Sequence, residues 1–435
     1  MTNQSQKNPN RKQIFIWTLF DFANTSYAIV VITFLFAVYF KQTIAEGKPI
    51  GDLYWSLGTS ISMLVTALIS PVLGAIADYS SNKKKFLLFF TVICLTCTAL
   101  LYFTGQGDVF LALLLFIFSN IGFEAGLVFY DAFLPEITAP KNYGRVSGYG
   151  YAMGYLGSLA SLAIAYPFIQ NEMIKETFPV SALFFLVFAL PIFLFLKEKK
   201  VQRNKEVSFL RVGFARVANT IKNLKHYRDL AWYLVAFFFY IEGVNTVIYF
   251  SGIYANTTLG FTISELILFF LIVQSTAIFG SVIFGIISDS YGQKKTIVLS
   301  LIIWIFTILL AYFSSGEEMF IAKFFSEKFE INSLSVLKNS FYVVGLLAGS
   351  VMGATQSVSR SLMSKLTPEE KKTEFFGFYS FFGKSSAILG PLVFGLVSFI
   401  FESQRPAILS IALFFVIGLF LLTKVNDPKT EEIAA

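Results

Sequence analysis

Six ionisable side chains lie inside long apolar stretches of this chain, and they are the residues best suited to do chemistry. They are Asp21, Glu124, Asp131, Glu242, Arg360 and Lys384. A charge at the centre of a membrane helix costs roughly 2.5–3.5 kcal/mol on insertion scales, so such residues usually bind a solute, an ion or one another. A carboxylate that is desolvated on one side of a membrane and paired on the other can also carry a proton.

Amides and hydroxyls accompany these charges at helical spacing. Asn120 and Glu124 are four residues apart, Glu242 and Asn245 are three apart, and Gln356 and Arg360 are four apart, so each pair shares a helix face. The fork of an arginine matches a carboxylate, and a buried carboxylate suits an ammonium. We therefore predict an amino-acid-like solute bound by Asp21, Asn24, Tyr27, Asn120, Glu124, Glu242, Asn245, Gln356, Arg360 and Lys384. In the alternative interpretation, Arg360 and Lys384 only lock helices together.

The coupling ion is left open by these residues. Glu124 and Glu242 are the first candidates for carrying a proton and Asp21 is the third, although Na⁺ binding or uniport also fits. His226, the only histidine, falls in a polar linker. Cys94 and Cys97 share one face of an apolar run and indicate packing, since a metal site would need more ligands. We expect no metal and no cofactor.

The elements that position these residues are membrane helices. The chain has 435 residues, of which 55% are hydrophobic and 14% charged, and this composition is too apolar for a soluble protein of its size. Runs of roughly 18 or more apolar residues are long enough to span a bilayer. We predict an all-α membrane protein with twelve transmembrane helices, near residues 14–40, 53–77, 86–104, 109–134, 146–170, 179–196, 229–255, 263–288, 295–314, 340–364, 375–400 and 405–423.

Basic residues indicate the topology. Most of the 34 lysines and arginines fall in alternate loops on one side, and positive charge stays in the cytoplasm. We therefore expect both termini to be cytoplasmic, the membrane to be the cell (inner) membrane, and the net charge of +7 to reflect topology rather than nucleic-acid binding. The predicted organisation is a six-helix bundle at 1–196, a cytoplasmic linker at 197–228 and a second six-helix bundle at 229–435. An amphipathic helix in the linker would lie over anionic lipid headgroups.

A short pattern occurs twice and indicates two homologous halves. Gly74 and Asp78 match Gly285 and Asp289 at an offset of 211 (285 − 74 and 289 − 78). An aspartate at a helix end can accept N–H groups from the N-terminus of a helix in the other half. We predict a cytoplasmic gate that includes a Glu136–Arg145 pair and places Glu369 near Arg360; its residues are Gly74, Asp78, Glu136, Arg145, Gly285, Asp289, Lys294, Lys295 and Glu369. The alternative is that these residues serve only topology and helix capping.

Several stretches are specific in combination. They are 17–27 (WTLFDFANTSY), 130–137 (YDAFLPEI), 148–157 (GYGYAMGYLG), 356–361 (QSVSRS) and 374–384 (EFFGFYSFFGK). With the duplicated Gly-x-x-x-Asp turn, they resemble the major facilitator superfamily, in the branch related to the fungal autophagy-linked vacuolar effluxer. The resemblance implies rocking-bundle alternating access around a cavity lined by the first, fourth, seventh and tenth helices, and in eukaryotic members it implies amino-acid export from the vacuole. The chain departs from the superfamily pattern directly after Asp78, where the usual basic residue and glycine are missing.

We predict a monomeric secondary transporter rather than an enzyme. The first candidate solute is an amino acid or similar zwitterion, with export favoured over import and a proton or sodium ion as coupling ion. Two alternatives stay open, namely a lipid or lysolipid translocator of the same fold and a non-transporting membrane sensor or scaffold. The sequence contains no Gly-x-x-x-x-Gly-Lys-Ser/Thr loop for nucleotide phosphates, so direct drive by ATP is not indicated.

Overall fold

The fold is helical throughout the part of the chain that the structure describes. This computed structural model describes residues 10–33, 35–48, 50–80, 82–198, 209–314, 324, 333–387 and 389–426. Within them, twelve helical stretches are long and apolar enough to cross a membrane. The predicted all-α architecture with twelve membrane helices is therefore confirmed. Residues 199–208 of the predicted linker lie outside the described residues.

The first half of the chain runs from α1 to α8. Its first span combines α1 (Arg11–Tyr27) and α2 (Leu35–Tyr39) with π-helical turns at Ala28–Thr33 and Phe40–Ile44. The other elements are α3 (Ile50–Ser80), α4 (Lys83–Leu100), α5 (Val109–Asp131), the short α6 (Leu134–Ile137), α7 (Tyr143–Gln170) and α8 (Thr177–Phe195). A short 3₁₀ turn at Leu101–Phe103 follows α4, and another at Pro140–Asn142 precedes α7.

The second half runs from α10 to α17 and follows the linker helix α9 (Phe209–Lys222) and a 3₁₀ turn at Leu224–Tyr227. Its helices are α10 (Arg228–Thr257), α11 (Ile263–Tyr291), α12 (Gln293–Phe313), α14 (Ser333–Leu366), α15 (Lys372–Ser386), α16 (Leu389–Ile400) and α17 (Gln404–Leu422), with a 3₁₀ turn at Glu369–Lys371 before α15. The predicted eleventh span is thus two helices, and Pro391 lies in the first turn of the second, where proline is tolerated.

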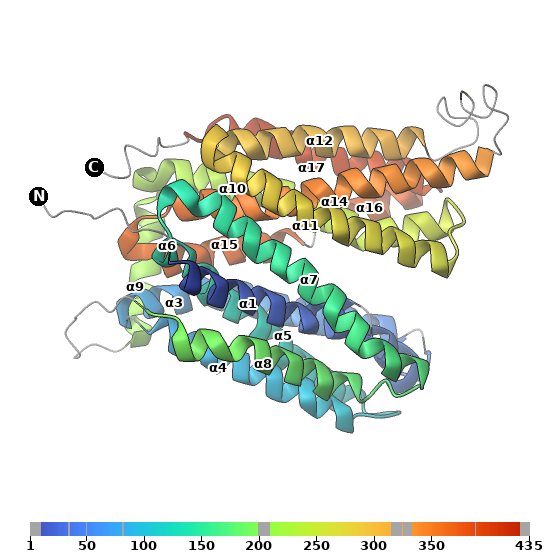
Figure 1. The fold of residues 1–435 in the computed structure, drawn as a ribbon, viewed down its shortest axis with the longest axis horizontal. Helices are drawn as coiled ribbons and strands as arrows, with labels where there is room; N and C mark the ends of the chain where they lie inside the picture. Colours follow the sequence, from blue (N-terminus) through green and yellow to red (C-terminus); the bar gives the residue numbers. More distant parts are fainter. Residues whose placement is uncertain are drawn as a thin grey trace, which may run out of the picture.

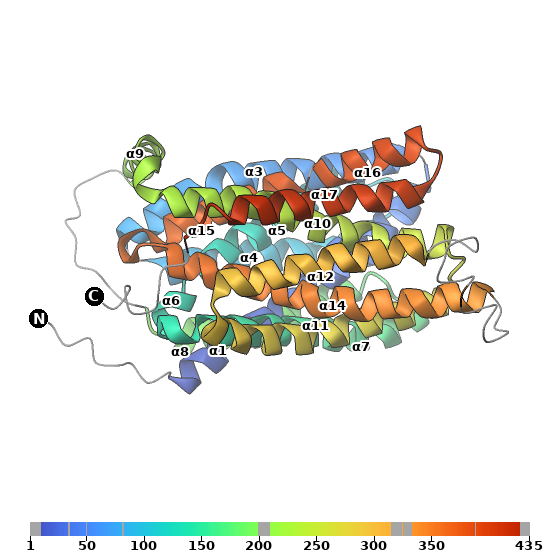
Figure 2. The same ribbon diagram turned by 90° about the horizontal axis from the view of Figure 1, so that it is seen from above.

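The linker helix marks one end of the molecule. It lies at the end of the bundle where α1 begins and α17 ends (Figures 1 and 2), and we call this the linker end. Most helices of the first half occupy the lower part of Figure 1 and most of the second half the upper part, with α7 running beside α11 at the border. The helix predicted in the linker is therefore present; whether it lies on lipid headgroups stays a prediction.

Two helix pairs, α3 with α15 and α7 with α11, join the halves by very close backbone contact. A Cβ atom added to Gly377 of α15 would lie 2.4 Å from the carbonyl oxygen of Ser70 in α3. A Cβ atom added to Gly148 of α7 would lie 2.2 Å from the carbonyl oxygen of Ser281 in α11. The two contacts are equivalent by the internal repeat, because 281 − 70 = 211 and 377 − 148 = 229. Small residues permit this approach of backbones.

Enlarging either glycine should destabilise the protein. We expect Gly377→Val to lower the free energy of unfolding by about 1–3 kcal/mol, because overpacking of this order forces helices apart. Thermal unfolding of the purified protein measures the effect. Gly395→Val is the matched control, because a Cβ atom there would meet nothing within 4 Å. Equal stability of the two variants would show that the α3–α15 contact is not tightly packed.

Candidate functional site

A polar cavity of about 170 Å³ lies between the two halves. Side chains of α5, α7, α10, α14 and α15 line it: Glu124, Leu127, Val128, Asp131, Tyr151, Phe237, Ile241, Asn245, Gln356, Phe376, Tyr379, Ser380, Gly383 and Lys384. Four predicted solute residues are among them, namely Glu124, Asn245, Gln356 and Lys384. The expectation from the superfamily holds for the fourth, seventh and tenth spans, but α1 contributes no lining residue, and α7 and α15 do.

Arg360 is buried beside the cavity and is bonded to the first half by every nitrogen of its guanidinium. Its Nη2 lies 3.2 Å from Oδ2 of Asp21, and its Nη1 lies 3.0 Å from Oδ1 of Asp131. Its Nε donates to the hydroxyl of Ser147 at 2.9 Å, and Nη2 also donates to the Ser147 carbonyl at 3.0 Å. These contacts match the locking role considered for Arg360, since the side chain does not line the cavity.

Three aromatic rings surround the same guanidinium. Its central carbon lies 4.3 Å from the ring centroid of Tyr151, 4.7 Å from that of Trp17 and 5.7 Å from that of Tyr130. Trp17 and Tyr130 also bond each other, since the Trp17 indole donates to the Tyr130 carbonyl and the Tyr130 hydroxyl donates to the Trp17 carbonyl, both at 3.1 Å. The rings attract the cation and exclude water, so the ion pairs of Arg360 are held in one geometry.

A second ion pair joins the halves inside the cavity. Nζ of Lys384 in α15 lies 2.5 Å from Oε2 of Glu124 in α5. The Lys384 side chain is 27% exposed and that of Glu124 4%, so the lysine is the more accessible partner. Because Lys384 is partly exposed to the cavity, it can reach a solute there. A hydrogen bond between the halves lies nearby: the hydroxyl of Tyr155, one turn after Tyr151 in α7, donates to Oε1 of Gln356 at 2.6 Å.

The charges at the centre do not balance. Three carboxylates (Asp21, Glu124 and Asp131) face two cations (Arg360 and Lys384), and no other charged side chain in the described residues pairs with these five or lines the cavity. Buried charges are costly unless they are compensated. With all five ionised, the cluster is one positive charge short, and a proton, a metal cation or an ammonium group could supply it.

Several predicted solute residues are buried inside the first half instead. The Tyr27 hydroxyl lies 2.8 Å from that of Ser119, and the Asn120 amide donates to the hydroxyl of Ser62 at 2.7 Å. Asn24 is 3% exposed. None of Asn24, Tyr27 and Asn120 lines the cavity. They pack where α1 and α5 meet their neighbours, so the structure does not bring them together with Glu124 and Lys384.

Glu242 also lies away from the cavity. It is fully buried between α10 and α16, where its Oε1 accepts the backbone N–H of Gly390 at 2.5 Å and the hydroxyl of Thr246 at 3.2 Å. Its Oε2 has no hydrogen-bond partner in the described residues. The shared helix face with Asn245 therefore does not extend to a shared site, because residues three apart still differ by about 60° around the helix, and Glu242 contacts α16 while Asn245 lines the cavity.

Each duplicated aspartate binds the start of a helix in the other half. Asp78 accepts the hydroxyl of Thr373 at 2.6 Å and the backbone N–H of Glu374 at 2.9 Å, at the start of α15. Asp289 accepts the backbone N–H groups of Gly144 at 2.7 Å and Arg145 at 3.1 Å, at the start of α7. A carboxylate is favoured there because the N-terminus carries the positive end of the helix dipole.

The predicted glycines make room for these contacts. A Cβ atom on Gly74 would lie 2.2 Å from the carbonyl oxygen of Thr373, and one on Gly285 would lie 2.6 Å from that of Gly144. Each glycine lies one helical turn before its aspartate. The repeated pattern thus pairs a small residue with a carboxylate so that the helix start can approach the aspartate.

One predicted ion pair is wrong. Arg145 pairs with Asp289, whose Oδ2 lies 2.7 Å from its Nε, and Glu136 pairs with Lys83 at the start of α4. The backbone N–H of Arg145 is one of the two that Asp289 accepts, so the Arg145 side chain already lies beside that carboxylate. Glu136 thereby closes a contact within the first half rather than between halves.

Other predicted gate residues lie at the surface of the linker end. Glu369 pairs with Lys372 at 3.2 Å and its side chain is 74% exposed, so its predicted position near the buried Arg360 is wrong. Lys294 donates to the carbonyl of Val425 at 2.6 Å, and Lys295 lies over the ring of Tyr291. These contacts tie helix ends together within the second half.

Asp131 is one of the six intramembrane charges but was not among the predicted solute residues, although a signal for its pairing was present. Asp131 and Arg360 are separated by 360 − 131 = 229 residues, the offset that also relates Gly148 to Gly377. They therefore occupy equivalent positions in the two halves. Tyr151 and Glu374 belong to stretches that carry the family resemblance and Ser147 to none, and no spacing in the sequence indicated the contacts of these three residues.

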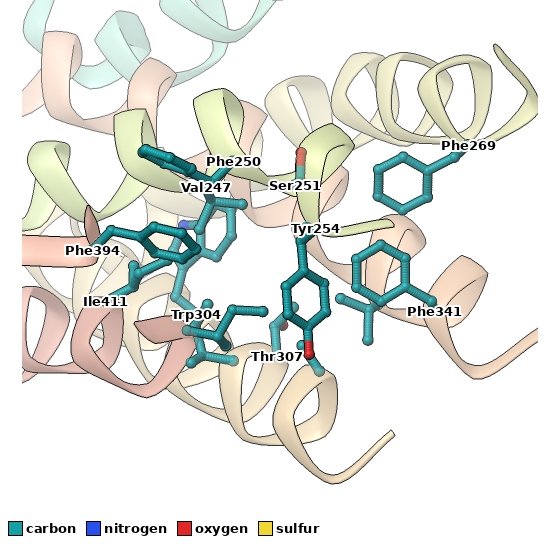
Figure 3. A pocket seen from close by; sticks show the side chains of 15 residues that line it. Val247, Phe250, Ser251, Tyr254, Phe269, Trp304, Thr307, Phe341, Phe394 and Ile411 are labelled. Carbon is teal, nitrogen blue, oxygen red and sulfur yellow. The ribbon is translucent and has the colours of Figure 1, made fainter. Parts of the chain in front are cut away.

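A small apolar cavity of about 40 Å³ lies within the second half. Figure 3 shows aromatic and aliphatic side chains around it, including Phe250, Trp304 and Phe394, while Ser251, Tyr254 and Thr307 are the labelled residues that carry a hydroxyl. It offers no charge to a polar solute. We interpret it as a packing void in the core of the half.

Comparison with known proteins places the chain in a family. The family model described as "Vacuole effluxer Atg22 like" matches residues 54–143 and 139–435. The chain is 31% identical to the uncharacterized MFS-type transporter YxiO of Bacillus subtilis, covering 97% of both chains. It is 23% identical to autophagy-related protein 22-1 of Penicillium rubens, over 89% of this chain and 78% of that protein.

Solved structures show the same fold at low identity. The human organic anion transporter MFSD10 superposes with a TM-score of 0.73 at 14% identity, covering 96% of this chain and all (100%) of that one. The proton:xylose symporter XylE superposes with a TM-score of 0.68 at 14% identity, covering 99% of both. The relatives are transporters and effluxers rather than enzymes. The chain therefore belongs to the Atg22-like vacuole effluxer family and is a membrane transporter of the major facilitator superfamily.

Proposed function

We propose that this transporter carries an amino acid or a similar small zwitterion, in exchange for a proton. The supporting observation is the charge arrangement of the central cavity, in which the carboxylates of Glu124 and Asp131 lie near the ammonium of Lys384. An amino acid needs an anionic partner for its ammonium and a cationic partner for its carboxylate. Asn245 and Gln356 add amide groups on the walls formed by α10 and α14.

Within this proposal the two ends of the solute have different partners. The solute ammonium binds Asp131, which lines the cavity and shares Arg360 with Asp21. The solute carboxylate binds Lys384, the accessible partner of the Glu124 ion pair. Arg360 is a positioning residue here, because its donors are all engaged by Asp21, Asp131 and Ser147.

The missing positive charge supports proton coupling. In the empty cavity a proton on Asp131 neutralises the cluster, because the three carboxylates outnumber the two cations by one. The solute ammonium then replaces that proton at Asp131, while the solute carboxylate adds a negative charge beside Lys384, so the loaded cluster again carries one net negative charge. Proton and solute compete for one carboxylate, which is the basis of exchange, and an inward proton gradient would drive export. The family description of an effluxer supports the same direction.

Glu242 is the second candidate for the proton. It is fully buried, and one carboxylate oxygen has no hydrogen-bond partner in the described residues. An unpaired buried carboxylate is costly when charged, so this group also suits a proton. Its position between α10 and α16 would couple the proton to the packing of one half rather than to the solute directly.

The contacts between the halves support alternating access. The hydrogen bonds and ion pairs that join described residues of the two halves lie at the cavity or between it and the linker end. We propose that the two halves are the moving units, that the structure is closed at the linker end, and that the Asp78 and Asp289 contacts break in each cycle. The basic loops support a cytoplasmic linker end in the cell membrane.

Removing the charge of Glu124 should weaken solute binding. We expect Glu124→Gln to raise the Kd for the preferred amino acid at least about tenfold, because Lys384 loses the partner that orients it. A thermal-shift screen of amino acids, followed by calorimetry, measures the affinity. Glu172→Gln, at an exposed position in the α7–α8 connection, is the matched control. Wild-type affinity in Glu124→Gln would remove this residue from the site.

Solute binding should weaken as the pH falls, because protons compete for Asp131. We expect Asp131→Asn to flatten this pH dependence, since its amide cannot be protonated in that range and Asp21 still pairs with Arg360. Calorimetric titrations across the acid range measure Kd for both proteins. Glu242→Gln should retain the pH dependence of the wild type. If Glu242→Gln alone abolishes it, the proton site is Glu242 and the assignment to Asp131 is wrong.

Neutralising Asp78 should open the linker end. We expect Asp78→Asn to shift the conformational equilibrium about 2- to 30-fold toward opening, since a negative charge at a helix start contributes roughly 0.3–2 kcal/mol. The readout is labelling of S380C, a cavity residue, by an impermeant thiol reagent from each side in a background without Cys94 and Cys97.

The matched control for the gate is Asp108→Asn. Asp108 accepts the N–H of Gly105 at 2.9 Å just before α5, at the end opposite the linker, and does not join the halves. Its substitution should leave the labelling ratio unchanged. Unaltered labelling and transport in Asp78→Asn would instead leave capping and topology as the role of this aspartate.

A further inference from the structure

A large apolar cavity lies at the linker end, outside the solute cavity. It measures about 410 Å³ and is enclosed by α3, α9, α10 and α15. All its lining side chains except Thr220 are apolar, among them four phenylalanines of α15. The Thr220 hydroxyl bonds Glu374 and accepts from Lys371 at 2.5 Å. A polar metabolite would find no free partner there, so the cavity suits a hydrocarbon.

The cavity opens toward lipid. Leu68 of α3 is 60% exposed and Ile221 of α9 is 51% exposed, and both line it. Figure 2 shows α9 at the edge of the bundle near the end of α3, and the two helices are in contact. Because α3 is a membrane helix, its exposed apolar side chains contact acyl chains. An acyl chain of a membrane lipid could therefore enter the cavity laterally from the bilayer leaflet.

The rim of this cavity is strongly basic. Residues 209–228 contain five lysines and arginines and no acidic residue. Arg216 is engaged by Glu374 and by the carbonyl of Glu370. Lys222, Lys225 and Arg228 are exposed, and no ion pair with another described residue neutralises them. Basic clusters of this kind at membrane level attract anionic lipid headgroups.

The helix that covers the cavity also reaches the gate. Thr220 and Arg216 of α9 both contact the buried carboxylate of Glu374. The backbone N–H of the same Glu374 donates to Asp78 at 2.9 Å. Whatever holds α9 against α15 therefore supports the Asp78 contact that joins the two halves.

We propose that this cavity binds an acyl chain of an anionic phospholipid whose headgroup pairs with Lys222, Lys225 and Arg228. The bound lipid fastens α9 to α15 and thereby stabilises the closed linker end. The lipid is a resident ligand and not the transported solute, so this inference does not depend on which solute the central cavity carries.

The headgroup half of the proposal is tested on the full-length protein in detergent. Phosphatidylglycerol is added and compared with phosphatidylcholine of the same acyl chains, and thermal stability and native mass spectrometry report binding. We expect phosphatidylglycerol alone to raise the melting temperature by several degrees. In Lys222→Gln/Lys225→Gln/Arg228→Gln its affinity should fall at least about tenfold.

A matched triple variant controls for charge. Arg11→Gln/Lys85→Gln/Lys141→Gln removes the same number of exposed basic residues but leaves the rim intact, so it should bind phosphatidylglycerol as the wild type does. An equal loss in both triple variants, or an equal response to the two lipids, would overturn the proposal in favour of nonspecific adsorption.

The acyl-chain half is tested by occupancy. Phosphatidylglycerol with a diazirine in its acyl chain should label peptides of α9 and α15 that contain Val217 and Phe378, which line the cavity. Ala231→Phe, which fills the cavity, should remove that labelling. Labelling spread evenly over lipid-facing helices such as α4, or unchanged labelling in Ala231→Phe, would show that the acyl chain does not enter the cavity.

Discussion

The buried guanidinium of Arg360 is the interaction on which the rest of the structure depends. It comes from the second half, and its ion-pair partners Asp21 and Asp131 both come from the first. A charge so far from water is stable only while it is paired, so separating the halves at this point would expose a large electrostatic cost. The pairing therefore sets how closely the halves approach at the linker end, and it leaves the cavity beside it one positive charge short. Gate, cavity and proposed coupling all follow from this one cluster.

Internal symmetry explains why the gate is duplicated and the centre is not. Asp78 of α3 accepts a backbone N–H at the start of α15, and Asp289 of α11 accepts one at the start of α7. These contacts are equivalent because a backbone N–H group is present whatever the side chain. At the centre, equivalent positions carry Asp131 and Arg360, whose opposite charges attract across the axis. The repeated fold thus gives the two equivalent aspartate contacts, and the side chains that differ between the halves give the charge arrangement at the centre. The apolar cavity under α9 belongs to neither repeat, since the linker helix occurs once.

The sequence allowed the fold to be predicted almost completely and the site only in part. Apolar run length determines a membrane helix, so the twelve spans were predictable, and the repeated Gly-x-x-x-Asp pattern indicated its own contact. Spacing along a helix shows that two residues share a face but not which way that face turns. Asn120 and Glu124 illustrate this, because Asn120 bonds within the first half while Glu124 reaches Lys384. Long side chains add a further ambiguity: Glu136 and Arg145 had several partners in reach, and only packing selected Lys83 and Asp289.

The most direct test of this account is to count the protons released when the solute binds. Solute would be titrated into weakly buffered, purified protein at mildly acidic pH while a pH indicator follows the solution. If the solute ammonium replaces a proton on Asp131, about one proton should leave for each solute bound. Proton uptake would contradict the account, because it would mean that proton and solute occupy the cavity together. Binding with no proton change would contradict it equally, since the solute would then bind without displacing a proton.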